Sequence, residues 1–374
     1  MPYMRQARYS VAENVQIFCS DTGPPPSNDY TTLVFLHGSL FYGGTFDTLF
    51  DHAHQHDVRI VSLNRREYPG STPYSRSELE ELHEGRKLFL DRLALHLARF
   101  LKAFVEEQEI PPISNDRKRG GIVIVGWSMG CVTSMTLLSS PDVLFEGLYN
   151  LLERYLKGLV LYDPPEIAFG YDIPQPHSEV SALYHPWSDT TSYATPEEGY
   201  RKKFLPWISS SFQHDLTQIH AGWRDLKGFD GRKRAEHCLA DAWSDEYLQK
   251  YTDLSAAARS ERPMYGSSMK STIREMTGHV LFDGKLRQSF FPQLEVLYLW
   301  GTCSPWTCIW ARMEIERLTD EHIKEGSPGR SITFLELKEL NHFAHLKNPR
   351  GLLEIVLGWS TAAPHSGNEL QEVK

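Results

Sequence analysis

A serine stands between two glycines directly after a short apolar run. The run Ile122 to Val125 leads into Gly126-Trp127-Ser128-Met129-Gly130, which is the Gly-x-Ser-x-Gly pattern of a nucleophile elbow. A serine at such a sharp strand-to-helix turn is held in a strained backbone conformation, and glycines on both sides let the strand and the helix approach without Cβ collisions. We predict that Ser128 is a nucleophile and that the Met129 N–H points toward a developing oxyanion.

A serine hydroxyl is a poor nucleophile until a base removes its proton, and histidine has the pKa suited to that role near neutrality. Of the 16 histidines, His342 is the best placed, because it follows the last apolar strand pattern and precedes a C-terminal helix pattern. An order of serine, acid and histidine along the chain requires its base there. We predict His342 as the base, with His345 as the alternative.

The third member of such a set, the acid, is in an unusual place. The loop after the penultimate strand commonly carries it, and there the sequence has Ser304. Glu314 and Glu316 follow further along, where solvated carboxylates on a helix face are expected. Asp163 instead ends an earlier core strand, at the carboxyl end where ligands meet an α/β sheet. We predict Asp163 as the acid; a turn or capping role is the alternative.

The segment Leu36-His37-Gly38-Ser39 follows another apolar run. A His-Gly pair lets the backbone turn sharply beneath a substrate, so the Ser39 N–H is our second predicted oxyanion donor, with Leu40 as the alternative. We also predict that Trp127 and Leu40 contact the substrate. This chemistry requires no metal ion and no organic cofactor.

The scaffold that would position these residues is an α/β fold. Apolar runs that suit buried strands alternate with helical patterns, which predicts a mostly parallel sheet with helices on both faces. The predicted strands are Val15 to Phe18, Thr32 to Leu36, Val58 to Leu63, Ile122 to Val125, Leu159 to Tyr162, Val296 to Trp300 and Ile332 to Leu337. The predicted helices are Ser77 to about Gln108, Met129 to Leu138, Leu144 to Leu156, Thr307 to Lys324 and Pro349 to Trp359.

About 130 residues separate two of these strands without a strong strand signal, and they include Trp187, Trp207, Trp223 and Trp243. A structureless loop of that length is improbable in a compact protein. We predict an inserted helical cap at 166–285 over a core formed by 1–165 and 286–374. Its aromatic residues either fill the core of the cap or line a pocket, and the second case favours a bulky hydrophobic substrate.

Composition excludes several classes of protein. The 374 residues carry a net charge of −9 and a pI near 6.0, which argues against a nucleic-acid surface. Five scattered cysteines favour a reducing compartment. A further alternative for the function is that Cys303 and Cys308 act as redox or nucleophilic residues. No apolar run has the length of a signal peptide or a membrane span. We expect a cytoplasmic protein, with the peroxisome left open, and a homodimer is compatible with the sequence.

Four segments together resemble the α/β-hydrolase fold superfamily. They are His37-Gly38, Asn64 to Ser71, the elbow around Ser128, and Asn341-His342-Phe343. The resemblance implies an eight-stranded type of sheet. Asn64 replaces the aspartate of the family's loop, and the usual acid is absent, although the family includes lactone hydrolases and acyl-CoA hydrolases whose acid follows the sixth strand. The Tyr-Asp-Pro-Pro sequence and the insert are also similar to fungal toxin and natural-product biosynthesis hydrolases.

The expected activity is acyl transfer to water by a serine hydrolase that acts on a carboxylic ester, lactone or thioester of a fairly bulky, hydrophobic small-molecule acyl substrate, without a cofactor. A carbon–carbon bond hydrolase or an acyl-transferring cyclase with the same three residues is an alternative within enzymes. A receptor or scaffold that retains the fold without turnover is an alternative of another class.

Overall fold

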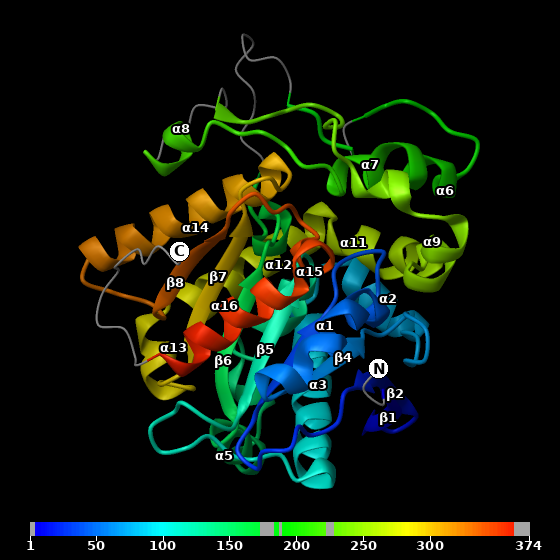
Figure 1. Cartoon of the computed structure of the whole chain (residues 1–374). Helices are drawn as coiled ribbons and strands as arrows, with labels where there is room; N and C mark the ends of the chain where they lie inside the picture. Colours follow the sequence, from blue (N-terminus) through cyan, green and yellow to red (C-terminus); the bar gives the residue numbers. More distant parts are fainter. Residues whose placement is uncertain (1–3, 173–182, 187–188, 222–227, 363–374) are drawn as a thin grey trace.

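The computed structural model describes residues 4–172, 183–186, 189–221 and 228–362. An eight-stranded sheet runs through the molecule in the order β1-β2-β4-β3-β5-β6-β7-β8 (Figure 1). The strands are β1 (Arg5–Ala12), β2 (Val15–Asp21), β3 (Thr31–Leu36), β4 (Val58–Asn64), β5 (Ile122–Trp127), β6 (Leu156–Tyr162), β7 (Glu295–Gly301) and β8 (Ile332–Leu337). The six strands from β3 to β8 are parallel, and β1 and β2 pair antiparallel at one edge. The predicted fold class is confirmed.

Strand β1 was not among the strands predicted from the sequence. It lies at the edge of the sheet, and its first residues are largely exposed. An edge strand that is solvated on one side carries polar residues such as Arg5 and Arg8, so it lacks the continuous apolar run that marks the central strands. Its buried positions, Tyr9 and Val11, follow the two-residue alternation of a half-buried strand.

Helices cover both faces of the sheet and divide the core into two clusters. In β5, Ile122 and Ile124 belong to one cluster, while Val123 and Val125 belong to the other, because successive side chains of a strand point to opposite faces. The helices outside the long connection from β6 to β7 are α1 (Asp47–Ala53), α2 (Arg76–His83), α3 (Lys87–Gln108), α4 (Gly130–Thr136), α5 (Glu146–Glu153), α14 (Trp306–Lys324), α15 (Ala344–Lys347) and α16 (Pro349–Thr361).

The predicted helix from Ser77 to about Gln108 is two helices, α2 and α3. The break falls at Gly85, which has a φ of +69°, and a Cβ there would lie 2.2 Å from the Ser268 carbonyl oxygen. Helix α2 has its own start, a capping box formed by Ser75 and Glu78. The periodic apolar stripe therefore belongs to α3, while the preceding polar segment forms a separate short helix.

The described part of the chain between β6 and β7 consists of short helices joined by loops. Its helices are α6 (Pro196–Gly199), α7 (Leu205–Ile208), α8 (Leu216–His220), α9 (Asp245–Tyr251), α10 (Leu254–Ala256), α11 (Arg262–Met264), α12 (Ser267–Thr277) and α13 (Gly284–Ser289). In Figure 1, α6 to α9 lie beyond one end of the sheet. Ile273 of α12, by contrast, packs in the cluster beside the sheet. The division at 165 and 285 stays a prediction, and Trp187, Trp223 and the tail after Ala363 lie outside the described residues.

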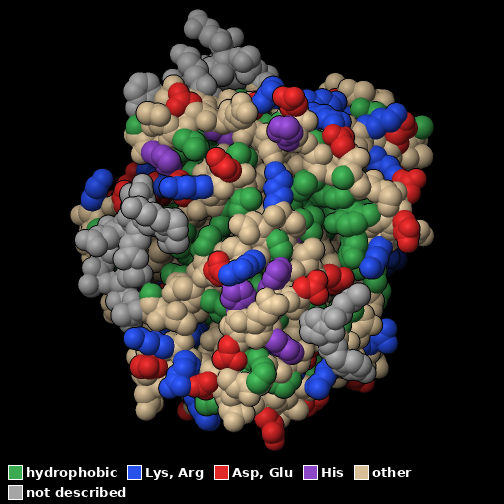
Figure 2. All heavy atoms as spheres, in the orientation of Figure 1, with side chains coloured by type: hydrophobic (Ala, Val, Ile, Leu, Met, Phe, Trp, Pro, Cys, Tyr) green, Lys and Arg blue, Asp and Glu red, His purple; other side chains and the backbone are tan. Residues whose placement is uncertain are grey.

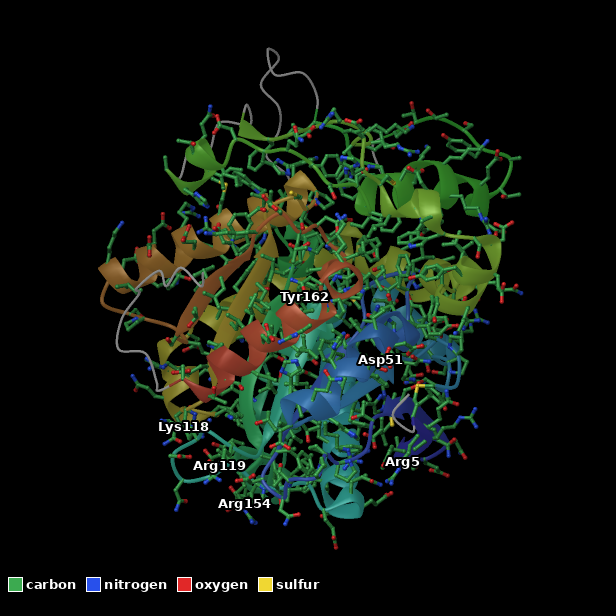
Figure 3. The ribbon with its side chains drawn as sticks, in the orientation of Figure 1. Arg5, Asp51, Lys118, Arg119, Arg154 and Tyr162 are labelled. Carbon is green, nitrogen blue, oxygen red and sulfur yellow. The ribbon has the colours of Figure 1, made fainter. Side chains whose placement is uncertain are left out.

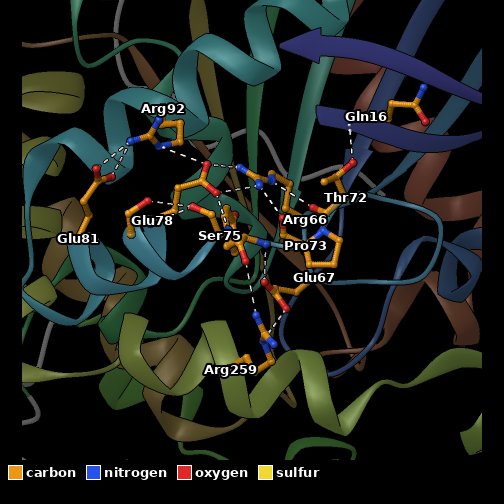
Figure 4. A network of polar contacts seen from close by, with 12 residues as sticks. Gln16, Arg66, Glu67, Thr72, Pro73, Ser75, Glu78, Glu81, Arg92 and Arg259 are labelled. Carbon is orange, nitrogen blue, oxygen red and sulfur yellow. Dashed lines mark hydrogen bonds and ion pairs between the residues drawn. The ribbon is translucent and has the colours of Figure 1, made fainter. Parts of the chain in front are cut away.

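A polar network joins this helical segment to the loop after β4 (Figure 4). Arg66 forms an ion pair of 2.5 Å with Glu78 of α2. Burial disfavours the Glu78 carboxylate, but the Arg66 guanidinium and hydrogen bonds from Ser75 together outweigh burial and lower the pKa of Glu78 to about 2. On the other side, Glu67 pairs at 3.0 Å with Arg259 of η8 (Ala257–Glu261), a π-helical turn. The loop is thus held from two directions.

The face of the molecule drawn in Figure 2 carries charges of both signs. Figure 2 shows Lys and Arg interspersed with Asp and Glu over the visible face. Within the described ranges, no helix combines the length and the apolar character needed to cross a bilayer.

Candidate active site

Ser128 occupies the turn between β5 and α4 with a φ of +54°. A left-handed conformation is rare for a residue with a Cβ, and such strain is typical of functional turns. Glycine is required on both sides: a Cβ at Gly126 would lie 2.5 Å from Ser134 Oγ, and one at Gly130 would lie 2.2 Å from the Leu36 carbonyl oxygen. The close approach of strand and helix predicted from the glycine spacing is present.

The predicted acid and base meet in the interior. His342 Nδ1 lies 2.6 Å from Asp163 Oδ2, and the two side chains are 2% and 0% exposed. The carboxylate also accepts hydrogen bonds from the Gly301 N–H at 2.9 Å and from the Ser304 hydroxyl at 2.7 Å. Asp163 directly follows Tyr162, which Figure 3 labels at the end of the sheet away from Lys118, Arg119 and Arg154.

Trp127 orients the loop that carries the histidine. Its indole N–H donates a 2.9 Å hydrogen bond to the His342 carbonyl oxygen, and the two rings lie 5.1 Å apart. Because Trp127 directly precedes Ser128, the same residue connects the elbow to the histidine loop. Because Asp163 accepts a hydrogen bond from Nδ1–H, the neutral imidazole of His342 has no proton on Nε2 and can accept one there.

The alternative base, His345, is in a different environment. It is fully buried, and its ring nitrogens lie 3.2 Å from the Tyr162 hydroxyl and 3.2 Å from Thr45 Oγ1. Burial holds its pKa well below the ordinary value, and the nearby His342 lowers it further. His345 is therefore a neutral residue of the core.

The alternative acids also have other partners. Glu316 pairs with Arg312 and Glu314 with Arg317, both at 2.7 Å along α14. Intrahelical ion pairs of this kind are typical of a helix surface. The structure joins His342 to Asp163 and to neither of these glutamates.

The loop after β3 lies against the elbow. A Cβ at Gly38 would be 2.8 Å from Ser128 Cβ, so only glycine permits this approach. The Leu40 N–H donates to the Tyr68 hydroxyl at 3.0 Å. In the described part of the chain, no acceptor binds the Ser39 or Met129 amide. These are the two predicted oxyanion donors.

Buried polar side chains hold this loop in place. The Arg65 N–H donates to His37 Nε2 at 2.9 Å, so Nδ1 carries the proton and donates to the Gly38 carbonyl at 2.8 Å. Burial, aided by the Arg65 charge, holds the pKa of His37 well below its usual value. Arg65 also pairs with Glu261 at 2.6 Å. A neutral histidine and a buried ion pair thus fix the backbone that leads to Ser39.

Glu261 reaches this loop from η8. It accepts a 2.8 Å hydrogen bond from the Ser39 hydroxyl, which also contacts the Tyr265 hydroxyl. Glu261 lies 222 positions from Ser39, so no local sequence pattern links the two residues or points to Glu261.

A cavity of about 580 Å³, including the part open to solvent, lies above the elbow. Ser128, Met129, His342, Ser39 and Trp127 all line it, and Leu40 does not. The lining also includes six apolar side chains, which are those of Phe41, Pro165, Ile167, Phe204, Ile208 and Phe343. The structure therefore brings every predicted site residue except Leu40 and Asp163 to the lining of one pocket, and Asp163 is hydrogen-bonded to His342, which lines it. The Ser128 hydroxyl forms no hydrogen bond with any residue that the structure describes.

One cluster near the cavity has the donor atoms of a metal site. Asp163, His342 and Cys308 place a ligand atom each within 4.8 Å of one another. The carboxylate and the imidazole are already bonded to each other, and burial raises the pKa of the Cys308 thiol well above its usual value. A protonated thiol is a poor metal ligand and a poor nucleophile. Cys303 is half-buried, and burial raises the pKa of its thiol as well.

Comparison with known proteins places this chain in a family. The chain matches the model of the alpha/beta hydrolase family over residues 33–355. Two solved structures share the fold. A serine hydrolase involved in carbazole degradation, the CarC enzyme, is 14% identical, with 96% of this chain and 98% of that chain covered and a TM-score of 0.50. The serine hydrolase CCSP0084 from the polyaromatic hydrocarbon-degrading bacterium Cycloclasticus zankles is 10% identical, with the same coverage and a TM-score of 0.50. No curated protein matches the chain.

Proposed function

This chain belongs to the alpha/beta hydrolase family, and we propose from that premise that it is a serine hydrolase of a carboxylic ester, lactone or thioester. One observation carries the proposal. His342 forms a buried hydrogen bond of 2.6 Å with Asp163, and His342 lines the same cavity as Ser128. Nucleophile, base and acid are then available to a single bound carbonyl group.

The first half of the reaction forms an acyl-enzyme. His342 Nε2 takes the proton of the Ser128 hydroxyl while Oγ attacks the substrate carbonyl carbon. The Met129 and Ser39 N–H groups donate to the oxyanion that results. The imidazolium then gives its proton to the leaving oxygen or sulfur as that bond breaks. Asp163 holds the proton on Nδ1 and stabilises the positive ring.

The second half reverses these roles. A water molecule loses a proton to His342 and attacks the acyl carbon, and the imidazolium returns a proton to Ser128 Oγ as the acid leaves. Each proton taken up by the base is thus given back within the cycle. No group outside the chain is required.

The segment 166–285 supplies a cap to this site in our proposal. Trp207 and Tyr265 belong to that segment and line the cavity together with Ser128. Aromatic and apolar walls favour a bulky substrate with hydrophobic parts.

The test is covalent labelling combined with turnover. Purified protein should be labelled by a fluorophosphonate at Ser128 and should hydrolyse activated esters, whereas Ser128→Ala should do neither. Retained hydrolysis in Ser128→Ala would show that Ser128 is not the nucleophile. Tight binding of small molecules without labelling of the native protein would instead indicate a ligand-binding member of the family.

A further inference from the structure

Four residues of the cavity carry a buried polar atom that forms no hydrogen bond with the described residues. The four atoms are Glu166 Oε2, His185 Nδ1, Trp207 Nε1 and Thr307 Oγ1. They come from separate parts of the chain: Glu166 begins the turn after β6, Thr307 lies in the first turn of α14, and His185 and Trp207 belong to the connection between.

Such atoms are uncommon, because an unsatisfied buried polar group costs about 1–3 kcal/mol. In the part of the chain that the structure describes, 15 side-chain atoms are of this kind, and four of them belong to residues of this one cavity. Their concentration beside Ser128 therefore calls for a partner that enters the cavity.

The chemistry of the atoms restricts that partner. The Trp207 indole can only donate, so it requires an acceptor such as a carbonyl or hydroxyl oxygen. The Thr307 hydroxyl can donate or accept. Burial raises the pKa of Glu166 to about 7, so near neutrality a large share of this carboxyl is protonated and can donate as well. Burial lowers the pKa of His185 to about 4, which makes it a neutral donor or acceptor.

The ring packing holds these groups in fixed places. His185 lies 5.7 Å from the Trp207 ring and 6.4 Å from the Trp306 ring, in both cases edge-on. The Trp306 indole donates a 2.9 Å hydrogen bond to the Tyr184 carbonyl, next to His185. His185 and Trp207, two of the four residues, are therefore held by packing between aromatic rings.

We propose that the cavity selects an oxygenated substrate, in which an apolar carbon skeleton bears carbonyl or hydroxyl groups away from the ester, lactone or thioester bond. These groups form hydrogen bonds with Trp207, Thr307 and Glu166. This inference rests on the proposed function, and it deepens it by naming the substrate class. A purely hydrocarbon acyl group would leave the polar atoms unpaired, so it is disfavoured.

The experiment measures binding separately from turnover. Ser128→Ala is titrated calorimetrically with three ethyl esters of similar size: 3-phenylpropanoate, 3-(4-hydroxyphenyl)propanoate and 3-(4-acetylphenyl)propanoate. At least one oxygenated ester should bind about tenfold more tightly than the phenyl ester, which is what one net hydrogen bond contributes. Adding Trp207→Phe or Thr307→Val should reduce that preference several-fold, because each removes a polar atom and retains most of the shape.

Matched controls exist in the same chain. Trp359 Nε1 and Thr277 Oγ1 are also buried without a partner, but both residues lie outside the lining of the cavity. Trp359→Phe and Thr277→Val should leave the preference unchanged. At the third position, Glu166→Leu should reduce the preference, and Glu166→Gln should retain part of it, since the amide still donates. Thermal unfolding of every variant verifies folding.

Equal binding of the three esters, or a preference that survives Trp207→Phe, Thr307→Val and Glu166→Leu together, would overturn the inference. Hydrolysis of the esters by the native protein, measured in parallel, tests the proposed function on its own. Turnover without a binding preference would reject the proposed substrate class but would support the proposed hydrolase activity. A binding preference without turnover or labelling would reject the proposed hydrolase activity, and the cavity would then be a binding site for oxygenated ligands.

Discussion

The hydroxyl of Ser304 donates a 2.7 Å hydrogen bond to Asp163 Oδ2, the same oxygen that lies 2.6 Å from His342 Nδ1. Ser304 lies in the loop after β7, which commonly carries the acid and here has a serine instead. β6 and β7 are parallel neighbours, so the ends of both strands reach the histidine from adjacent positions. The carboxylate comes from one strand, and a hydrogen-bond donor to it comes from the next.

The two residues should differ sharply in their effect on catalysis. Asp163→Asn should lower kcat by about 10⁴, because an amide at this position favours the wrong tautomer of His342. Ser304→Ala removes one hydrogen bond to the carboxylate and should lower kcat by about tenfold or less. Steady-state kinetics on an activated ester measures both. Similar losses in the two variants would contradict the assignment of Asp163 as the acid.

The acid can be moved to the neighbouring strand. In Asp163→Asn, the additional change Ser304→Asp should recover at least tenfold in kcat, since the new carboxylate starts from a position that already contacts residue 163. In the native background the same change should reduce activity, because two buried carboxylates would stand side by side. Failure of the double variant to exceed Asp163→Asn, with folding intact, would show that Ser304 is out of reach of His342.

Glu261 should position the oxyanion loop. Glu261→Gln weakens the pair with Arg65 and the hydrogen bond to the Ser39 hydroxyl, so we expect kcat to fall by about 10-fold to 100-fold, with a smaller change in KM. Arg259→Ala is the matched control, because Arg259 lies on the same turn and pairs with Glu67 away from Ser39. An equal loss in the control would indicate that the whole turn, and not the contact to Ser39, matters.

Alanine substitutions at two glycines test the close packing of the elbow through the free energy of unfolding. A Cβ at Gly130 would meet the Leu36 carbonyl oxygen at 2.2 Å, whereas one at Gly358 in α16 would meet nothing within 4 Å. Gly130→Ala should therefore lower the free energy of unfolding by about 2 kcal/mol or more. Gly358→Ala should raise it by about 0.5–1 kcal/mol, since alanine stabilises a helix interior. Urea denaturation compares the two, and a stable Gly130→Ala variant would refute the close packing.

Glu166 should make the stability of the protein depend on pH. Its folded pKa of about 7 lies above the ordinary 4.5, so the folded state binds more protons between these values and stability falls as the pH rises. The full difference corresponds to about 3 kcal/mol, at 1.36 kcal/mol for each pH unit. Relative to Glu166→Gln, the native protein should lose stability from about pH 4.5 to about pH 7 and then level off. A constant difference in unfolding free energy across this range would exclude the shift.

The sequence alone was enough to locate Ser128, His342 and Asp163 as candidates. Each signal is local: a glycine pattern for the elbow, a histidine after the last strand, and an aspartate at the end of a buried run. The apolar runs also predicted the central strands, since a strand buried on both faces must be continuously hydrophobic. The break at Gly85 was missed, because the contact that requires glycine there comes from Ser268, far along the chain.

Tertiary structure alone decided which carboxylate meets the histidine, what holds the oxyanion loop, and which residues of the cavity carry a buried polar atom without a partner. Ser304, Glu261 and Trp207 have ordinary sequence neighbours, and their roles depend on segments that are distant in the chain. Local patterns report backbone geometry and burial, which depend on residues a few positions apart. Hydrogen-bond satisfaction depends on every group that folding brings within about 3 Å, so it is determined only when the whole chain has packed.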